Sequence, residues 1–189
     1  MSELATLLRA IEFAARKHRE QRRKGRGSVP YINHPVAVAE VIARVGRVTD
    51  LVVLTAAVLH DTVEDTATTP EEIEREFGAE VREVVAEVTD DKRLPKEERK
   101  RLQVVNAPRA SRRAKIVKLG DKIMNVVDIT NDPPPDWPVA RRREYFEWAK
   151  QVVDGCRGAN AALERHFDKA VAQGLAVVRG EESKESKGS

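Results

Sequence analysis

Hydrophobic residues recur along the chain three and four positions apart, which is the spacing of one face of an α-helix. Ser2 can cap the first such segment, whose apolar face consists of Leu4, Leu7, Leu8, Ile11 and Ala15. The strict alternation of polar and apolar residues that is typical of a half-buried β-strand forms no convincing pattern. The sequence therefore predicts an all-α helical bundle with a single domain.

The starts and ends of the later helices follow from capping and breaking residues. Pro35 suits the first position of a second helix, and Asp50 can cap a third helix that runs to about Glu64. The third helix is apolar on nearly all sides, so we expect it to be the central buried helix. Thr69 and Glu72 have the spacing of a capping box. Further helices are expected over residues 70–77, 81–88, 95–106, 114–129, 139–153 and 159–173.

Two internal segments cannot continue a helix. Residues 22–27, called the basic loop below, read Arg-Arg-Lys-Gly-Arg-Gly, and residues 131–135 end in three consecutive prolines. The end of the chain is charged and rich in serine, without an apolar anchor, so we expect residues 176–189 to be disordered. The domain is accordingly expected to span residues 1–175.

Composition narrows the classes of function. Charged residues make up 34% of the 189 residues and aromatic residues only 4%, so aliphatic side chains must build the core. The net charge of +3 fits an anionic ligand but is too small to indicate nucleic-acid binding. The single cysteine, Cys156, excludes an internal disulfide. The longest nearly apolar run, Leu51–Leu59, is too short to cross a bilayer. We expect a cytoplasmic protein without a membrane or nucleic-acid partner, and the oligomeric state stays open.

Four ionisable residues end the apolar third helix and give the strongest chemical signal in the chain. On a continuous helix, His60 would lie above Glu64, and Asp61 above Asp65. Burying such groups without partners is costly, and a divalent cation removes that cost when it takes some of them as ligands. The cluster therefore predicts one half of a metal site.

Other segments must supply the remaining ligands. His34 directly precedes Pro35, and Asp121 lies in an apolar helical segment. Two imidazoles and two carboxylates suit manganese, iron(II) or zinc, with positions left open for water. A His-Asp pair also arises by chance, and Asp61 would then only cap or solvate the helix end.

The surroundings of these residues extend the pattern over nearly the whole chain. The segments that carry it include FAARKHREQRRKG at 13–25, PYINHPVAVAEVI at 30–42, AAVLHDTVEDT at 56–66 and KIVKLGDKIMNVVDI at 115–129. With these segments, the chain resembles the HD-domain hydrolases from about residue 4 to residue 173. Within them it resembles the RelA/SpoT hydrolase domain and its free-standing form, the small alarmone hydrolases of the metazoan SpoT-homologue type.

The resemblance implies roles for individual residues. The metal ligands of the family, typically for manganese, correspond to His34, His60, Asp61 and Asp121. The acidic pair that activates and orients the attacking water corresponds to Glu64 and Asp65. The residues near the bound nucleotide correspond to Arg23, Lys24, Lys96, Asn125, Arg141 and Tyr145.

The chain departs from the family pattern at three positions in one segment. Gly120 stands where alanine is usual, Met124 where an aromatic residue or histidine is frequent, and Val127 where arginine is usual. These positions include no ligand and neither acidic residue. The departures therefore bear on substrate preference and not on hydrolysis itself.

The function that the resemblance implies is manganese-dependent removal of pyrophosphate from the 3′ position of ppGpp or pppGpp, which leaves GDP or GTP. One alternative is a phosphatase for another nucleotide with a 2′- or 3′-phosphate, such as NADPH. A second alternative is a nucleotide sensor without activity, and the intact acidic pair argues against it.

Other chemically active side chains are interpreted as structural. His18 has no acidic neighbour and is expected to lie at the surface or in the packing. Cys156 has no neighbouring base that would make it a nucleophile. Phe146 and Trp148 fall at helical spacing and are expected in the core, while Trp137 either covers a base or holds the proline loop.

Overall fold

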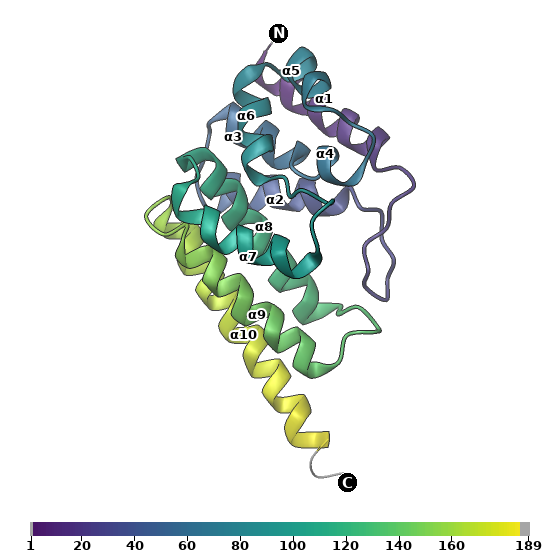
Figure 1. Ribbon diagram of the computed structural model, residues 1–189, viewed down its shortest axis with the longest axis vertical. Coiled ribbons are helices and arrows are strands. Elements are labelled where there is room, and N and C mark those ends of the chain that lie inside the picture. Colours follow the sequence, from purple (N-terminus) through teal and green to yellow (C-terminus); the bar gives the residue numbers. More distant parts are fainter. Residues whose placement is uncertain (1, 186–189) are drawn as a thin grey trace.

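The computed structural model describes residues 2–185, which fold into helices joined by loops (Figure 1). In that range the β-type pairing is limited to an isolated bridge between Arg22 and Pro30, so the all-α prediction is confirmed. None of these helices combines the length and the apolar character that a membrane span requires. The elements are α1 (Glu3–Lys17), α2 (Asn33–Arg44), α3 (Leu51–Leu59), α4 (Thr62–Asp65), α5 (Pro70–Phe77), α6 (Ala79–Val88), α7 (Lys96–Asn106), η1 (Ala107–Arg109), α8 (Arg112–Asn131), α9 (Val139–Asp154) and α10 (Ala161–Glu185).

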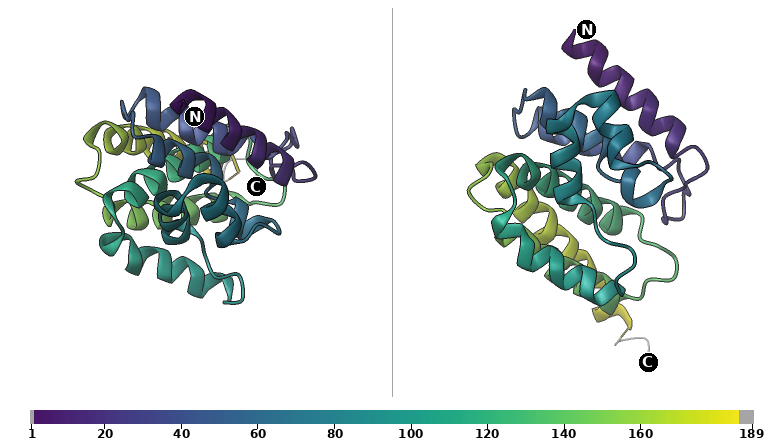
Figure 2. Two further views of the ribbon diagram at one scale, coloured as in Figure 1. Left: turned by 90° about the horizontal axis from the view of Figure 1, so that it is seen from above. Right: turned by 45° about the horizontal axis from the view of Figure 1, so that its top comes forward.

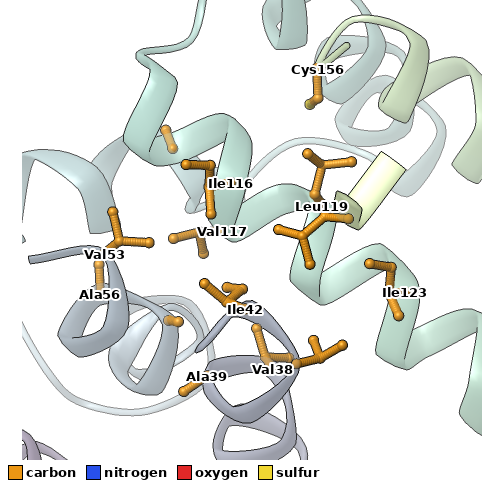
Figure 3. Packing of buried hydrophobic residues seen from close by; sticks show 14 of the residues in the cluster. Val38, Ala39, Ile42, Val53, Ala56, Ile116, Val117, Leu119, Ile123 and Cys156 are labelled. Carbon is orange, nitrogen blue, oxygen red and sulfur yellow. The ribbon is translucent and has the colours of Figure 1, made fainter. Parts of the chain in front are cut away.

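Helix α8 runs through the middle of the molecule, and it contacts α2, α3, α6, α9 and α10. Helices α1 and α5 lie at one end of the molecule, and α9 and α10 lie at the other (Figures 1 and 2). The core between α2, α3 and α8 is aliphatic, with Ile42, Val53, Val117 and Leu119 almost completely buried (Figure 3). Burial of these side chains holds together the segments that carry the candidate ligands.

The predicted caps start their helices. Ser2 accepts a hydrogen bond from a backbone N–H of α1 at 3.2 Å, and Asp50 accepts one from α3 at 2.9 Å. Thr69 accepts one from the Glu72 N–H at 3.2 Å, as a capping box requires. The Glu72 carboxylate instead pairs with Lys17 at 2.8 Å, which ties α5 to α1.

The predicted helix from Leu51 to Glu64 is wrong in one respect, because it is broken at His60 and Asp61 into α3 and α4. The side chains explain the break. His60 Nδ1 lies 2.8 Å from the carbonyl oxygen of Ala57, and the Thr62 hydroxyl donates to that of Leu59 at 2.7 Å. These bonds replace backbone bonds that a continuous helix would make.

The last helix is longer than the sequence predicted. Helix α10 continues to Glu185, so the segment up to that residue is helical where we expected disorder from residue 176. Packing against α9 supports it, because Val178 is buried and Glu181 accepts a hydrogen bond from buried Arg142 at 3.2 Å. The rest of the expected disordered tail, residues 186–189, lies outside the described residues.

Candidate functional site

Three parts of the fold bring the predicted metal ligands together. His34 lies in the first turn of α2, His60 and Asp61 lie at the break between α3 and α4, and Asp121 lies in the middle of α8. One ligand atom from each of His34, His60 and Asp121 falls within 4.8 Å of the others. Asp61 Oδ2 lies 3.0 Å from His60 Nε2 and 4.0 Å from His34 Nε2. The side chains of all four predicted ligands therefore converge.

The break in the helix is what allows two neighbouring residues to face one site. On a continuous helix, consecutive side chains point about 100° apart. Asp61 instead has φ −96° and ψ −6°, outside regular helical geometry. Its carboxylate thereby turns toward the imidazole of His60.

The two carboxylate ligands are oriented by partners behind them. Asp121 Oδ2 accepts from the Lys122 ammonium at 2.8 Å, and Asp121 Oδ1 accepts from the Asn125 amide at 2.5 Å. The hydroxyl of Tyr31 donates to Asp61 Oδ2 at 2.6 Å. Hydrogen-bonded partners of this kind fix the geometry of metal ligands in proteins.

The donors fit a divalent cation. His60 Nδ1 is engaged by the carbonyl of Ala57, so His60 Nε2 presents its lone pair to the cluster. That nitrogen is buried and has no hydrogen-bond partner among the described residues. It lies 3.0 Å from Oδ2 of Asp61, and this short distance favours a positive charge between the two atoms, which a proton or a metal cation supplies. Two nitrogens and two carboxylate oxygens are a donor set for manganese, iron(II) or zinc.

The cluster keeps its carboxylates ionised. Burial alone would raise the pKa of Asp121, but the Lys122 ammonium and the hydrogen bond with His34 hold it well below its usual range. Burial likewise opposes ionisation of Asp61, and the neighbouring His60 outweighs it and lowers the pKa. Both carboxylates therefore stay available as ligands.

Glu64 faces the same cavity as the ligands. This cavity of about 160 Å³, called the metal cavity below, is lined by His60, Asp61, Glu64 and Asp121 among others. The Glu64 carboxylate accepts a hydrogen bond from the Asp90 N–H at 3.1 Å. Burial raises the pKa of Glu64 to about 7. Glu64 thus combines access to the cluster with the basicity that a general base needs.

Asp65 points elsewhere. Its carboxylate accepts a hydrogen bond from the Gln21 amide at 2.9 Å and pairs with the Lys92 ammonium. Asp65 lines the neighbouring cavity of about 510 Å³ and not the metal cavity. A continuous helix would place His60 above Glu64 and Asp61 above Asp65. The structure interrupts that helix between Leu59 and Thr62, so the reason for expecting this stacking no longer holds. The two members of the acidic pair consequently differ in surroundings.

Two larger cavities adjoin the metal cavity. The first, called the nucleoside arm below, has a volume of about 510 Å³. The second, called the basic arm, has a volume of about 730 Å³. The residues that the sequence predicted as nucleotide contacts all line one or both arms: Arg23, Lys24, Lys96, Asn125, Arg141 and Tyr145.

Asn125 connects the nucleoside arm to the ligands. It lines all three cavities. Its amide oxygen accepts from the Arg23 guanidinium at 2.9 Å, while its nitrogen donates to Asp121. Arg23 is also paired with Asp128 at 2.6 Å, which holds its side chain in place.

Cations gather in the basic arm. Burial, together with the charges of Arg141 and Lys100, lowers the pKa of Lys96. The Arg141 guanidinium stacks 4.4 Å from the ring centroid of Trp137, which in turn packs against Tyr145. Positive groups held this close together favour the binding of a polyanion.

The basic loop is fastened to the end of α8. Asp132 accepts hydrogen bonds from the N–H groups of Arg26 at 2.9 Å and Gly27 at 3.2 Å. A Cβ atom at Gly25 would lie 2.1 Å from the Asp132 carboxylate, so only glycine permits this approach. The loop that carries Lys24 is therefore anchored next to both arms.

Sequence reasoning missed several residues around the site. Tyr31 lies in a segment that was recognised, but no role was assigned to it. His18 is buried and packs against Tyr31, as one alternative predicted, yet its Nδ1 also contacts the Gln21 amide oxygen at 2.7 Å. Lys122 was missed too, although a lysine beside an aspartate in an apolar helix signals an internal ion pair.

The three departures from the family pattern all lie on α8. Met124 and Val127 are half-buried and pack against the core. A Cβ atom at Gly120 would lie 2.7 Å from the side chain of Ile42, so glycine lets α2 and α8 approach closely. None of the three lines the metal cavity, the nucleoside arm or the basic arm.

Known proteins are similar to this chain in sequence and in fold. The family model of the HD domain matches residues 10–147. The human guanosine-3′,5′-bis(diphosphate) 3′-pyrophosphohydrolase MESH1 is 58% identical over 86% of this chain and 91% of its own length. The Drosophila melanogaster protein of the same name is 47% identical over 89% of this chain and 94% of its own length. A solved structure of a metazoan orthologue of SpoT, reported to hydrolyse ppGpp and to act in starvation responses, superposes with a TM-score of 0.87 at 47% identity and covers 89% of this chain and 95% of its own.

Proposed function

The chain belongs to the HD domain family, and on that premise we propose that it is a metal-dependent guanosine-3′,5′-bis(diphosphate) 3′-pyrophosphohydrolase. One observation carries the proposal, namely that two imidazoles and two carboxylates converge beside Glu64 between two cation-lined arms. The function named for the human relative, at 58% identity, supports the same reaction. The substrates are ppGpp and pppGpp, and the products are pyrophosphate and GDP or GTP.

The metal ligands in this proposal are His34, His60, Asp61 and Asp121, and the metal is manganese. When bound by these residues, a divalent cation would supply a water molecule of lowered pKa and a positive charge beside the scissile phosphoryl group. The buried, unpartnered lone pair of His60 Nε2 supports the assignment. Lys122 and Tyr31 act on the ligands, because each holds one carboxylate in a fixed orientation.

Glu64 is the general base in this proposal. It takes a proton from the water whose oxygen attacks the phosphorus next to the 3′ oxygen. The bond between that phosphorus and the 3′ oxygen breaks, the 3′ oxygen takes up a proton from solvent, and Glu64 releases its proton to solvent. A carboxylate with a pKa of about 7 accepts the proton more readily than an ordinary glutamate. Asp65 orients Gln21 and Lys92 at the entrance of the nucleoside arm.

The two arms hold different parts of the substrate in this proposal. Arg23, Asn125 and Tyr145 line the nucleoside arm and hold the guanosine. Lys24 also lines the basic arm, where Lys96 and Arg141 meet the phosphates on the 5′ side. Such positive groups offset the charge of a substrate that carries phosphates at both ends.

The test is to incubate the protein with ppGpp, with and without manganese, and to separate the products by ion-exchange chromatography. We expect GDP and pyrophosphate only with the metal. Asp61→Ala removes one ligand and should abolish turnover, whereas Asp154→Ala, at an exposed position of α9, should not. Wild-type protein that leaves ppGpp intact under both conditions would overturn the proposal.

NADPH is the alternative substrate, and the same assay decides it. Hydrolysis at its 2′-phosphate would release inorganic phosphate. If NADPH is turned over and ppGpp is not, the site is a phosphatase for a different nucleotide. If neither is turned over, the chain is a nucleotide sensor with the hydrolase fold.

A further inference from the structure

Lys118 is a buried cation whose role the reaction described above leaves open. It lies on α8 and lines the metal cavity, with only 7% of its surface exposed. None of the described residues forms a hydrogen bond or an ion pair with its ammonium group. Lys122, one helical turn further on, is fully engaged, because its ammonium pairs with Asp121 and lies 4.8 Å from the ring centroid of Trp148.

An ammonium group that reaches only a narrow cavity and has no partner is unfavourable, because it has lost part of its water and gained no counter-charge. Burial and the neighbouring Lys122 both lower the pKa of Lys118. The negative charges of Asp90 and Asp121 act in the opposite direction without contacting it. An anion that enters the metal cavity would supply the missing partner.

The direction of α8 indicates which part of the substrate this anion is. Lys118, Asp121 and Asn125 follow one another along the helix at intervals of about one turn, so their side chains share a face. Asn125 lines the nucleoside arm, and Asp121 is one of the proposed metal ligands. Lys118 lies beyond Asp121, on the side away from the nucleoside arm, and does not line that arm.

A 3′-pyrophosphate must follow the same order. Its nucleoside end occupies the nucleoside arm, the phosphate next to the ribose lies at the ligands, and the terminal phosphate projects further into the metal cavity. We propose that Lys118 binds the terminal phosphate of the 3′-pyrophosphate group and selects a pyrophosphate as the leaving group. The inference rests on the proposed function, because it names the contact for one part of that substrate.

The test compares wild-type protein with Lys118→Met, which keeps the length of the side chain and removes its charge. Lys115→Met is the matched control, since Lys115 lies on the same helix and lines none of the three cavities. Two quantities are measured at a fixed concentration of free manganese: kcat/KM for ppGpp, and the inhibition constants of inorganic pyrophosphate and of GDP. Thermal unfolding of each variant is recorded in parallel.

We expect Lys118→Met to lower kcat/KM about 10- to 100-fold, as the loss of a hydrogen bond to a charged group would. The inhibition constant of pyrophosphate should rise by a similar factor, and that of GDP should change less than about twofold. The melting temperature should not fall, because the substitution removes an unpaired buried charge.

Two outcomes would count against different claims. Suppose that wild-type protein hydrolyses ppGpp. The role of Lys118 is then refuted, while the function stands, if kcat/KM of Lys118→Met lies within about threefold of the wild-type value. It is refuted equally if the inhibition constants of GDP and pyrophosphate rise by the same factor. If wild-type protein does not hydrolyse ppGpp, the proposed function fails, and the inference fails with it.

Discussion

Glu64→Gln should stabilise the metal-free protein at alkaline pH, although it should destroy activity. The pKa of Glu64 is raised from 4.5 to about 7, mainly by burial. At about 1.4 kcal/mol per unit of pKa, the ionised carboxylate costs the folded state roughly 3 kcal/mol at pH 8. Because 19% of the side chain is exposed, water screens part of this charge, and the free-energy cost is about 2 kcal/mol. Glutamine has nearly the same shape and carries no charge at any pH.

The sign of the effect follows from proton binding. Between pH 4.5 and about 7, the folded wild-type protein holds a proton on Glu64 that the unfolded chain has released. The stability of the wild-type protein therefore falls across this window as the pH rises, relative to the variant. The advantage of Glu64→Gln should grow from less than about 1 kcal/mol at pH 5 to about 2 kcal/mol at pH 8, or about 4–8 °C in melting temperature.

The assay is thermal unfolding in the presence of a chelator at pH 5, 6, 7 and 8. Glu83→Gln, at a position whose side chain is 62% exposed, is the matched control and should show no such trend. A difference in melting temperature between Glu64→Gln and wild type that does not depend on pH would refute the reasoning about burial. So would a variant that is less stable than wild type at pH 8.

The Glu64→Gln substitution should lower activity, although it raises stability. Loss of a general base lowers the rate by about 10²- to 10⁴-fold. In the wild-type protein, kcat/KM should rise with pH through an apparent pKa no higher than about 7, since a bound cation favours the carboxylate. A variant that is both stabilised and fully active would exclude Glu64 as the base.

The other predictions concern the support of the site. Tyr31→Phe removes the hydrogen bond to Asp61 and should weaken manganese binding about 10-fold in calorimetric titrations; unchanged affinity would contradict the orienting role. Gly120→Ala forces a Cβ atom against Ile42 and should cost about 1–2 kcal/mol in urea unfolding, and adding Ile42→Val should restore most of this, whereas additive losses would disprove the clash. Asp132→Ala frees the basic loop and should raise KM for ppGpp several-fold with little change in kcat; an unchanged KM would show that the anchor is dispensable. Removing metal with a chelator should reduce turnover to about 1% or less, and added manganese should restore it.

The helices could be predicted because their hydrophobic periodicity is strong, and the caps at Ser2, Asp50 and Thr69 locate their starts. The predicted ligands converge because α2, α3 and α8 share one core, which the apolar pattern already required. Local sequence rules were sufficient for the helices, whereas the set of four ligands rested on the resemblance to the HD-domain hydrolases.

The features that sequence reasoning missed depend on specific side-chain bonds between or within elements. The break before α4 arises because Thr62 and His60 take up carbonyl oxygens that helix N–H groups would otherwise use. The extra length of α10 depends on α9, since Arg142 pairs with Glu181 across the two helices. Periodicity along one helix carries no information about such partners.

Asn125 has a consequence for how the two ligands of this protein influence each other. It bonds simultaneously to Arg23, in the nucleoside arm, and to Asp121, a proposed metal ligand. Occupation of either place fixes the orientation of the same amide group. If metal strengthens nucleotide binding through this amide group, thermodynamic reciprocity requires that nucleotide strengthens metal binding by the same factor. Where divalent metal is scarce, such a positive coupling would load the metal chiefly onto protein that already holds nucleotide.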